Sequence, residues 1–332
     1  MRRLRPADRG ALCFKLRRVA LPLKPPVAPQ LARSAKAIPT GGGYAYEPKW
    51  DGFRALAFVD GADVYLQSRN GRPLRRYFPE LSFPEGRYVL DGEIVLFDDQ
   101  GRQDFDMLGQ RIHPAESRIR MLAELTPTRF VAFDLLAHGD DVLLALSQAD
   151  RRDRLAELVA KPVDLTPSTT DPAEAEPWLR GAEGVIAKLQ DAPYKPGERT
   201  GMTKIKRVRT IDAVVLGWRP GKLEDTVGSL ILALYDDSGT LRPVGHTSGF
   251  SAKEKRELPA RLAEHETGRR GTGDPSRWAN ERDLEWIELR PELVVEVTFD
   301  HTSNGRIRHG AKVARWRTDK DPRDCTLEQL AQ

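Results

Sequence analysis

The stretch YEPKWDGFRAL, residues 46–56, places Lys49 beside an acid and an arginine at the start of an apolar-rich run. In residues 53–68, FRALAFVDGADVYLQS, side chains on each side of the pair Asp60-Gly61 alternate as they do on the two faces of a strand. Such alternation around a turn dipeptide predicts a β-hairpin. Lys49 is therefore expected at the edge of a strand, just before the hairpin begins.

Lys49 is a candidate nucleophile. An amine attacks phosphorus or a carbonyl carbon only when it is neutral, whereas an ordinary lysine, with a pKa of about 10.4, is mostly protonated at neutral pH. Neighbouring cations or partial burial can lower that pKa enough to make the amine reactive. The alternative is a strand-end lysine whose ammonium lies in water, and the tetrapeptide KWDG alone favours this alternative.

The composition is that of a globular protein with two domains. A chain of 332 residues exceeds what one hydrophobic core usually supports. Hydrophobic residues make up 39% and charged residues 31%, which argues against a membrane protein or a disordered chain. The net charge of +4 is too small to favour nucleic acid as a partner by itself.

The cysteines and the N-terminus indicate a cytoplasmic protein. Cys13 and Cys325 stand near opposite ends and have neither zinc-ligand spacing nor the number needed for a disulfide framework. No apolar run approaches the length of a membrane span. The start, MRRLRPADRG, lacks the apolar core of a signal peptide, so residues 1–20 are interpreted as an N-terminal extension that is disordered.

Residues 21–209 are predicted to form a mixed domain of helices and a largely antiparallel sheet. Its first part, residues 21–43, is rich in proline and then glycine and is expected to wrap a surface rather than form a core. Buried strands are predicted within residues 87–102, 129–141 and 182–189, and a helix within residues 147–160. Ser147 and Asp150 at the start of that helix resemble a capping box.

The composition changes near TKIKRVRTIDAVVLGW, and residues 210–332 are predicted to form a second domain. Its strands are predicted at residues 214–218, 230–235, 241–247, 294–299 and 311–316. A helix opened by the capping box of Ser251 and Glu254 separates the first three from the last two. This is the element order of a small Greek-key barrel of the OB type. The predicted fold class is therefore α+β, an antiparallel-sheet domain followed by a small β-barrel.

Two acids stand at the edges of apolar strands, Glu93 in LDGEIVLF and Glu183 in AEGVIAKL. Carboxylates at such positions, facing one cleft, can hold Mg²⁺ and orient phosphates. Taken singly, each is better explained as a charge that keeps the end of a strand in water.

A basic run, ERTGMTKIKRVR, contains Lys204 and Lys206 on either side of Ile205. In a strand this spacing places both lysines on one face, suited to an α-phosphate, while the isoleucine packs inward. Phe133, in VAFDLL, either belongs to the core or stacks on a base. Arg69, in SRNGR, lies in a basic turn that is equally an ordinary Asn-Gly loop.

The order of these patterns is more informative than any one of them. The succession KWDG, SRNG, DGE, FD, EGVIAK and TKIK resembles the motif series of the covalent nucleotidyltransferases, which comprise ATP-dependent DNA ligases, RNA ligases and mRNA-capping guanylyltransferases. EPKWDGFRA, SRNGR, EGVIAK and the terminal RWRTDKDPRDCT look like the bacterial ATP-dependent DNA ligases, particularly the small ligase C type. The implied fold is a nucleotidyltransferase (adenylation) domain followed by an OB-fold domain.

The resemblance implies that Lys49 is the catalytic residue and forms a phosphoramidate with AMP from ATP. The cofactor-binding residues that it implies are Glu47, Arg54, Arg69, Glu93, Phe133, Lys188, Lys204, Lys206, Arg317 and Lys320. Glu183 and Glu93 would hold the metal ion, Mg²⁺ or Mn²⁺.

Within this set the motifs imply distinct roles. Phe133 would stack on adenine, and Arg54 and Arg69 would hold the ribose and phosphates or the 5′-phosphate of a nick. Arg317 and Lys320, with Asp319 between them, would orient the pyrophosphate when the OB domain closes. One departure is Met202, which stands where ligases often have Trp; a flexible thioether can fill the same apolar space.

The implied function is the sealing of 5′-phosphate/3′-hydroxyl nicks in duplex DNA during repair, by a monomer with no membrane association. Phosphate contacts from Lys and Arg would make DNA binding salt-sensitive and largely independent of sequence. A preference for ribonucleotides at the nick stays open.

Several alternatives remain at this stage. An RNA ligase or a capping guanylyltransferase would use the same lysine chemistry, although the bacterial-ligase motifs argue against capping. A non-catalytic OB-fold nucleic-acid-binding protein would explain the basic run but would not require Lys49, Glu93 and Glu183 in this order. A P-loop enzyme is excluded, because no G-x-x-x-x-G-K-[ST] stretch occurs, and zinc chemistry lacks ligands.

Overall fold

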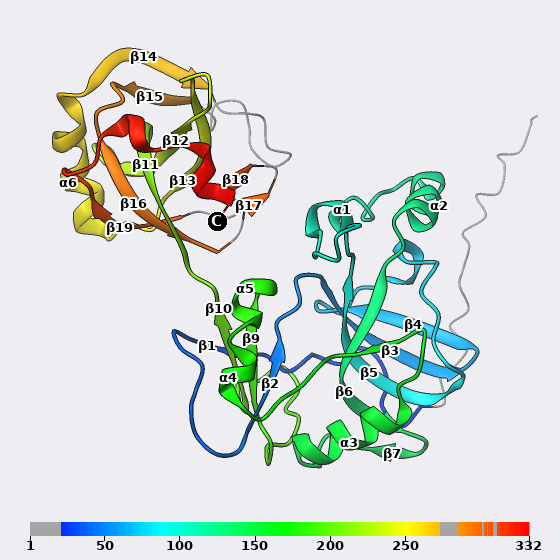
Figure 1. Ribbon diagram of the computed structural model, residues 1–332. Helices are drawn as coiled ribbons and strands as arrows, with labels where there is room; N and C mark the ends of the chain where they lie inside the picture. Colours follow the sequence, from blue (N-terminus) through cyan, green and yellow to red (C-terminus); the bar gives the residue numbers. More distant parts are fainter. Residues whose placement is uncertain (1–20, 273–284, 301, 304, 308–310, 332) are drawn as a thin grey trace, which may run out of the picture. The chain divides into compact units, whose positions relative to one another are not determined.

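A computed structural model describes residues 21–272, 285–300, 302, 303, 305–307 and 311–331 (Figure 1). The predicted extension and Cys13 lie outside these residues. The chain divides into two compact units, the first ending at Ile205 and the second beginning at Lys206, a few residues before the boundary predicted from the sequence. No helix in the described part of the chain is long and apolar enough to cross a lipid bilayer.

The larger sheet of the first unit has six strands in the order β4-β3-β5-β6-β7, with β8 paired to β6. They are β3 (Phe53–Gly61), β4 (Asp63–Ser68), β5 (Gly86–Val95), β6 (Arg129–His138), β7 (Asp141–Val142) and β8 (Asp164–Leu165). All pairs are antiparallel except β6 with β8. The predicted hairpin is confirmed, but its turn is Gly61-Ala62, because Asp60 pairs with Asp63 instead of lying in the turn.

The smaller sheet of the first unit carries the candidate lysines. Its order is β1-β10-β9-β2. The strands are β1 (Arg33–Ala35), β2 (Tyr44–Pro48), β9 (Gly184–Leu189) and β10 (Met202–Lys206). β2 and β9 are antiparallel, so the end of β2 meets the beginning of β9.

Short helices surround these sheets. They are α1 (Phe105–Gly109), α2 (Glu116–Leu125), α3 (Gln148–Leu158), α4 (Pro172–Ala175) and α5 (Trp178–Gly181), with a 3₁₀ turn η1 (Arg75–Tyr77). The helix α3 packs against β6 (Figure 1). Ser147 caps α3 as predicted, because its hydroxyl accepts the N–H of Asp150.

The strand β3 is buried on both faces. Its even-numbered residues Leu56 and Phe58 pack with Leu21 and Val27, and its odd-numbered residues pack in a second cluster. The side chain of Gln67 exchanges two hydrogen bonds, of 2.9 and 2.7 Å, with the backbone of Val27. The prediction that the proline-rich segment forms no core was therefore wrong for its first residues, because a strand with two apolar faces needs a cover on each.

The second unit is built on one curled sheet. Its strands are β11 (Arg209–Pro220), β12 (Val227–Tyr235), β13 (Leu241–Thr247), β14 (Glu266–Thr272), β15 (Glu285–Leu289), β16 (Val294–Phe299) and β19 (Lys312–Trp316). The long strand β11 pairs with β12, β15 and β16, which lets the sheet curl around one core. A small ribbon of β17 (Thr302–Ser303) and β18 (Arg306–Ile307) and the 3₁₀ turns η3 (Pro322–Asp324) and η4 (Leu327–Ala331) complete the unit.

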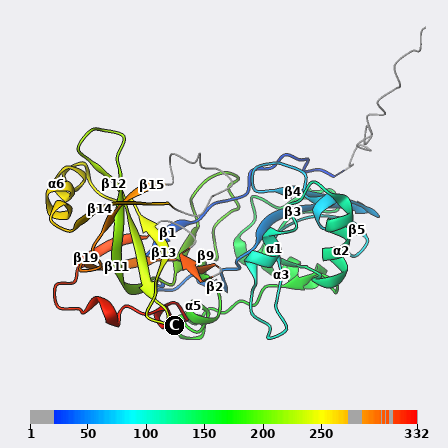
Figure 2. The same cartoon turned by 90° about the horizontal axis from the view of Figure 1, so that it is seen from above.

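The predicted helix of this unit is α6 (Ala252–Ala263), which begins with the complete capping box of Ser251 and Glu254. It packs against β12, and both views place it at the edge of its unit (Figure 1, Figure 2). The predicted strands are confirmed, but β14 and β15 were missed. The sequence of β14, ETGRRGT, has no apolar alternation, so a two-residue period could not reveal it.

Candidate active site

Lys49 lies where two strands of the smaller sheet meet. Its backbone N–H donates to the carbonyl of Gly184 at 2.8 Å, and the N–H of Glu183 donates to the carbonyl of Lys49 at 3.1 Å. The ammonium Nζ of Lys49 forms an ion pair with Oε2 of Glu183. The lysine side chain is 20% exposed and the glutamate 7%, so the amine is held in place yet still accessible.

The glycine of the same motif is required by close packing. A Cβ atom at Gly52 would overlap the backbone carbonyl of Ile94 in the neighbouring strand β5 and crowd the side chain of Glu93. A larger residue there would push β5 away from the chain that leads from Lys49 into β3. Gly52 therefore keeps the DGE segment next to the lysine.

Arg54 is fixed by a buried carboxylate. Its guanidinium donates to both oxygens of Asp91, at 3.0 and 2.6 Å, and Asp91 is completely buried. The hydroxyl of Tyr194 donates to Asp91 at 2.7 Å and itself accepts the N–H of Gln30 at 2.9 Å. A bidentate pair of this kind holds the guanidinium in one orientation.

Asp91 and Tyr194 were not among the site residues predicted from the sequence. Asp91 does stand in the DGE motif inside an apolar strand, a position where a charge needs a partner, and that was the available signal. Tyr194 contributes from a distant loop, and no local pattern marks it.

Glu93 faces Arg54 across the strand pair β3–β5. Burial raises the pKa of Glu93 to about 8, against the opposing effect of the positive charges of Lys49 and Arg54. A carboxylate in this state has a strong tendency to acquire a proton or a cation. Glu93 is thus close enough to Lys49 to be influenced by the ammonium that forms the ion pair with Glu183.

Glu47 and Lys188 form a buried ion pair across β2 and β9. Nζ of Lys188 lies 2.8 Å from Oε2 of Glu47, and each side chain is 3% exposed. Burial raises the pKa of Glu47, while the charge and hydrogen bond of Lys188 lower it. The same ammonium donates to the carbonyl of Phe133 at 2.8 Å. These contacts tie the segment before Lys49 to strand β6.

The ring of Phe133 lies between two cations. Nζ of Lys188 lies 5.0 Å from its centroid and the guanidinium carbon of Arg54 lies 5.3 Å from it. The side chain is partly exposed, unlike the buried residues that flank it in β6. Of the two interpretations offered by the sequence, a ring available for stacking fits this position better than a core residue.

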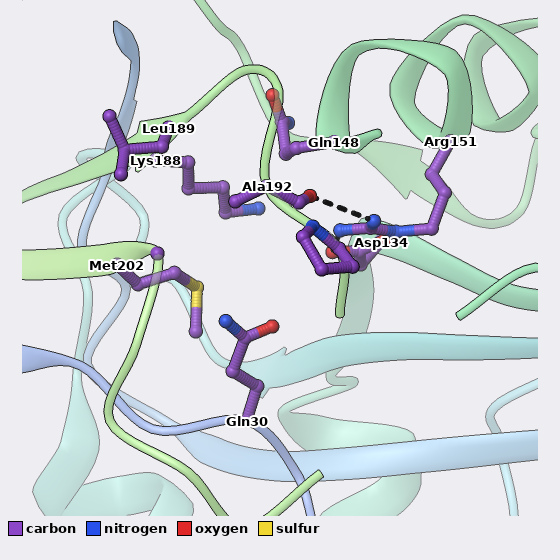
Figure 3. Close-up of a pocket in the computed structure, with 10 residues that line it drawn as sticks. Gln30, Asp134, Gln148, Arg151, Lys188, Leu189, Ala192 and Met202 are labelled. Carbon is purple, nitrogen blue, oxygen red and sulfur yellow. Dashed lines mark hydrogen bonds and ion pairs between the residues drawn. The ribbon is translucent and has the colours of Figure 1, made fainter. Parts of the chain in front are cut away.

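A small cavity borders Lys188 on the side of β10 (Figure 3). Met202 and Gln30 line it opposite the ion pair of Arg151 and Asp134, whose atoms approach to 2.8 Å. Met202 thus lines the cavity together with Lys188. The buried pair fixes the residue that follows Phe133 to helix α3.

The remaining predicted residues before the terminal motif lie at the surface of the first unit or at the start of the second. In β10, Ile205 is buried while the neighbouring lysines are partly exposed, as the alternation predicted. Lys206, which begins the second unit, forms an ion pair of 3.0 Å with Asp300 of that unit. Arg69 is exposed in the tight turn after β4, where Gly71 has a positive φ of 77°.

The terminal motif forms a separate cluster of charges after β19. Arg317 donates to both oxygens of Asp212, at 2.9 and 3.0 Å, and to both oxygens of Asp319, each at 2.9 Å. The hydrogen bond from Arg317 lowers the pKa of Asp319 to about 2. Lys320 lies 3.9 Å from Asp324. The predicted residues are thus adjacent within the second unit.

Comparison with known proteins identifies the family. Residues 29–206 match the profile described as ATP dependent DNA ligase domain, and residues 224–320 match the ATP dependent DNA ligase C terminal region. The chain belongs to the ATP-dependent DNA ligases. The ligase is 46% identical over 336 residues to DNA ligase C1 of Mycolicibacterium smegmatis. The match covers 93% of this chain and 95% of that protein.

Further relatives agree with this assignment. DNA ligase C of Mycobacterium tuberculosis is 45% identical to the ligase over 345 residues, covering 93% of this chain and 95% of that one. Among solved structures, the ligase domain of LigD from M. tuberculosis is 30% identical with a TM-score of 0.51, covering 90% of this chain and 98% of that chain. The predicted family, the α+β fold with an OB-fold domain and the ATP dependence are confirmed, and the capping and non-catalytic alternatives are disfavoured.

Proposed function

We propose that this ligase seals nicks between a 5′-phosphate and a 3′-hydroxyl in duplex DNA, as part of DNA repair, through a lysyl-AMP intermediate. The observation that carries the proposal is the position of Lys49 where two strands meet. Its amine forms an ion pair with Glu183, and its side chain is 20% exposed and therefore accessible. Two of its relatives are named DNA ligase C1 and DNA ligase C. A third relative, 32% identical, is named a multifunctional non-homologous end joining DNA repair protein, and the match covers 37% of its length.

In the first step Lys49 attacks the α-phosphorus of ATP. The amine loses a proton, a bond forms between Nζ and the α-phosphorus, and the bond from that phosphorus to the bridging oxygen of pyrophosphate breaks. Holding the amine beside the nucleotide removes most of the entropic cost of bringing the two together. We assign Lys204 and Lys206 to the phosphates, where their charges would stabilise the transition state.

The nucleotide would be held by the groups around Phe133. Its partly exposed ring offers a surface on which adenine can stack. Arg54, oriented by Asp91, and Glu93 are proposed to bind the ribose and phosphates. ATP as the nucleotide is supported by the family match and by a solved mycobacterial DNA ligase D, 30% identical to this chain, that is complexed with ATP.

Glu183 and Glu93 fit a divalent cation, Mg²⁺ or Mn²⁺, that arrives with the nucleotide. Both carboxylates lie around the ammonium of Lys49, and hard cations prefer oxygen ligands of this kind, often one or two carboxylates completed by substrate phosphates. In the described part of the chain no group of three or more His, Cys, Asp or Glu side chains is arranged to hold a metal alone. A bound cation would neutralise charge that develops on the phosphates.

The later steps transfer AMP and release it. An oxygen of the 5′-phosphate attacks the α-phosphorus, the bond to Nζ breaks, and Lys49 regains its proton. The 3′-hydroxyl then attacks the activated phosphate, loses its proton and displaces AMP. Arg317, Asp319 and Lys320 are proposed to orient the pyrophosphate in the first step. DNA would be bound chiefly through its phosphates, in a salt-sensitive way, by a monomer, and a ribonucleotide at the nick is a variant of the same substrate.

Incubation with ATP labelled at the α-phosphate tests the proposal. Label that survives denaturation, requires Mg²⁺ or Mn²⁺, and leaves when nicked DNA is added is the expected result. Lys49→Ala should abolish the label, whereas Lys36→Ala, a change at an exposed lysine, should not. Label from GTP but not ATP, or no label with folded protein, would contradict the proposed function.

A further inference from the structure

Asp212 stands at a position in the second unit that strand pairing does not favour for a negative charge. It lies in β11 directly opposite Glu296 of β16, and like charges directly opposite each other destabilise a pair of strands. Its side chain is only 17% exposed. A neutral side chain would suit this strand pair better, so the carboxylate points to a role other than folding. Asp212 belongs to none of the motifs that marked the site in the sequence.

The carboxylate of Asp212 holds one end of Arg317. Nη1 of Arg317 donates to both of its oxygens, at 2.9 and 3.0 Å, and the backbone N–H of Arg317 donates to the carbonyl of Val294 at 2.9 Å. The backbone of Asp212 is fixed in turn by the side chain of Gln329. Its N–H donates to Oε1 of Gln329 at 2.9 Å, and its carbonyl accepts from Nε2 at 3.1 Å. The guanidinium of Arg317 is therefore anchored at both ends to a rigid strand.

The opposite edge of the guanidinium is the one that a substrate can reach. Nε and Nη2 of Arg317 donate to the two oxygens of Asp319, each at 2.9 Å. This edge is a fork that fits two oxygens of a carboxylate or of a phosphate. Asp319 is 65% exposed and can turn into water at little cost when another anion arrives, whereas Asp212 is mostly covered and stays in place. Asp212 thus sets the direction of an anion-binding fork.

We propose that Asp212 is a positioning residue for the first step of the reaction. It holds Nη1 of Arg317 so that the fork of Nε and Nη2 is presented to two oxygens of the departing pyrophosphate. This inference rests on the proposed function, which assigns Arg317 to the pyrophosphate. No bond to Asp212 forms or breaks in the reaction, and its carboxylate acts only through Arg317.

A double-mutant cycle separates positioning from folding. The rate constant for AMP attachment from ATP is measured for wild type, Asp212→Asn, Arg317→Ala and the double variant. Asp212→Asn should be roughly 10-fold slower than wild type, since a misaligned group loses much of its effect on the transition state. The double variant should be no slower than Arg317→Ala alone, because the effect of Asp212 passes through that arginine. Sealing of a nick that already carries a 5′-adenylate should be nearly unchanged in Asp212→Asn.

Asp236→Asn is the matched control for stability. Asp236 belongs to the same unit, is 18% exposed, and accepts from Nε of Arg242 at 2.7 Å. It therefore resembles Asp212 in burial and in its arginine partner, but it has no part in the proposed reaction. Asp236→Asn should keep the wild-type rate of both steps, even if its urea midpoint falls as far as that of Asp212→Asn.

Three results would overturn the inference. They are a wild-type rate of AMP attachment in Asp212→Asn, an equal slowing of both steps in that variant, and the same slowing by Asp212→Asn whether or not Arg317 is present. If Asp212→Asn does not fold, Asp212→Glu, which keeps the charge but moves the carboxylate, replaces it in the same cycle. Absence of AMP attachment in the wild-type protein would instead contradict the proposed function.

Discussion

The two clusters of charge in this ligase differ in how they are held. Around Lys49 the partners are buried: burial raises the pKa of Glu93 to about 8, and Asp91 is fully covered. In the terminal motif the partners of Arg317 are less buried: Asp212 is 17% exposed and Asp319 is 65% exposed, and the hydrogen bond from Arg317 lowers the pKa of Asp319 to about 2.

This difference separates stability from catalysis. A buried charge that loses its partner destabilises the folded protein, whereas an exposed charge returns to water at little cost. The first cluster is therefore part of the structure of its unit and is ready before nucleotide binds. Asp319 is therefore expected to contribute little to folding, which would leave it available for the proposed contact with the substrate.

The largest effect is expected from removing the buried partner of Arg54. Asp91→Ala should lower the free energy of unfolding by roughly 3–5 kcal/mol, because it leaves an unpaired guanidinium in a partly buried position. AMP attachment should fall with it, since Arg54 loses its orientation. Urea denaturation measures the first and the labelling assay the second. Asp319→Ala, the matched change in the exposed cluster, should leave the urea midpoint nearly unchanged; an equal loss in both variants would contradict the comparison.

Arg317→Ala should affect the rate more than the stability, although it leaves the mostly buried carboxylate of Asp212 without this partner. If Arg317 contacts the leaving pyrophosphate, its loss should slow AMP attachment by roughly 100-fold, the usual effect of removing one group that stabilises developing charge. The later sealing step, assayed with DNA that already carries a 5′-adenylate, should be affected less. A variant that is slow in both steps to the same degree would show that Arg317 has another role.

A smaller effect is expected in the pH dependence of stability, measured in EDTA to keep metal away. The folded pKa of Glu93, about 8, lies above the ordinary value of 4.5, so the folded state binds the proton more tightly. Its contribution to the free energy of unfolding is therefore present at low pH and is lost as pH rises toward 8. Glu93→Gln should flatten this decline. If the free energy of unfolding of the variant declined with pH as steeply as that of the wild type, the pKa of Glu93 would not be raised in the folded protein.

The smallest effect is expected at the start of α6, outside either cluster. Ser251→Ala removes the hydroxyl that accepts the N–H of Glu254 and should cost roughly 1 kcal/mol of stability. AMP attachment should be unchanged, because this helix carries none of the proposed site residues. Loss of activity in a folded Ser251→Ala protein would mean that the second unit depends on α6 for more than stability.

Local sequence patterns predicted the elements but not every contact between them. The alternation in residues 53–68 and the series of short motifs were sufficient to place Lys49 and Glu183 at strand ends, because both signals are local. Asp91 and Tyr194 orient Arg54 through contacts between segments that lie far apart in the chain, and only the folded arrangement brings these segments together.

The same reason explains the errors at the edges of the fold. The first residues of the proline-rich segment fill the second face of β3, a need that arises only when β3 is placed in its sheet. The strand β14 pairs with β15, but apolar and polar residues do not alternate in the sequence of β14. Each of these features depends on tertiary packing, which overrides the local propensity of the segment.

Tandem mass spectrometry of the ligase after incubation with ATP and Mg²⁺ tests the central claim most directly. The expected result is AMP attached to the side chain of Lys49, through a bond that is cleaved by acid and survives base, as for a phosphoramidate. Addition of nicked DNA should return that peptide to its unmodified mass. AMP on another residue, or none on Lys49 in protein that seals nicks, would contradict the assignment of this lysine as the nucleophile.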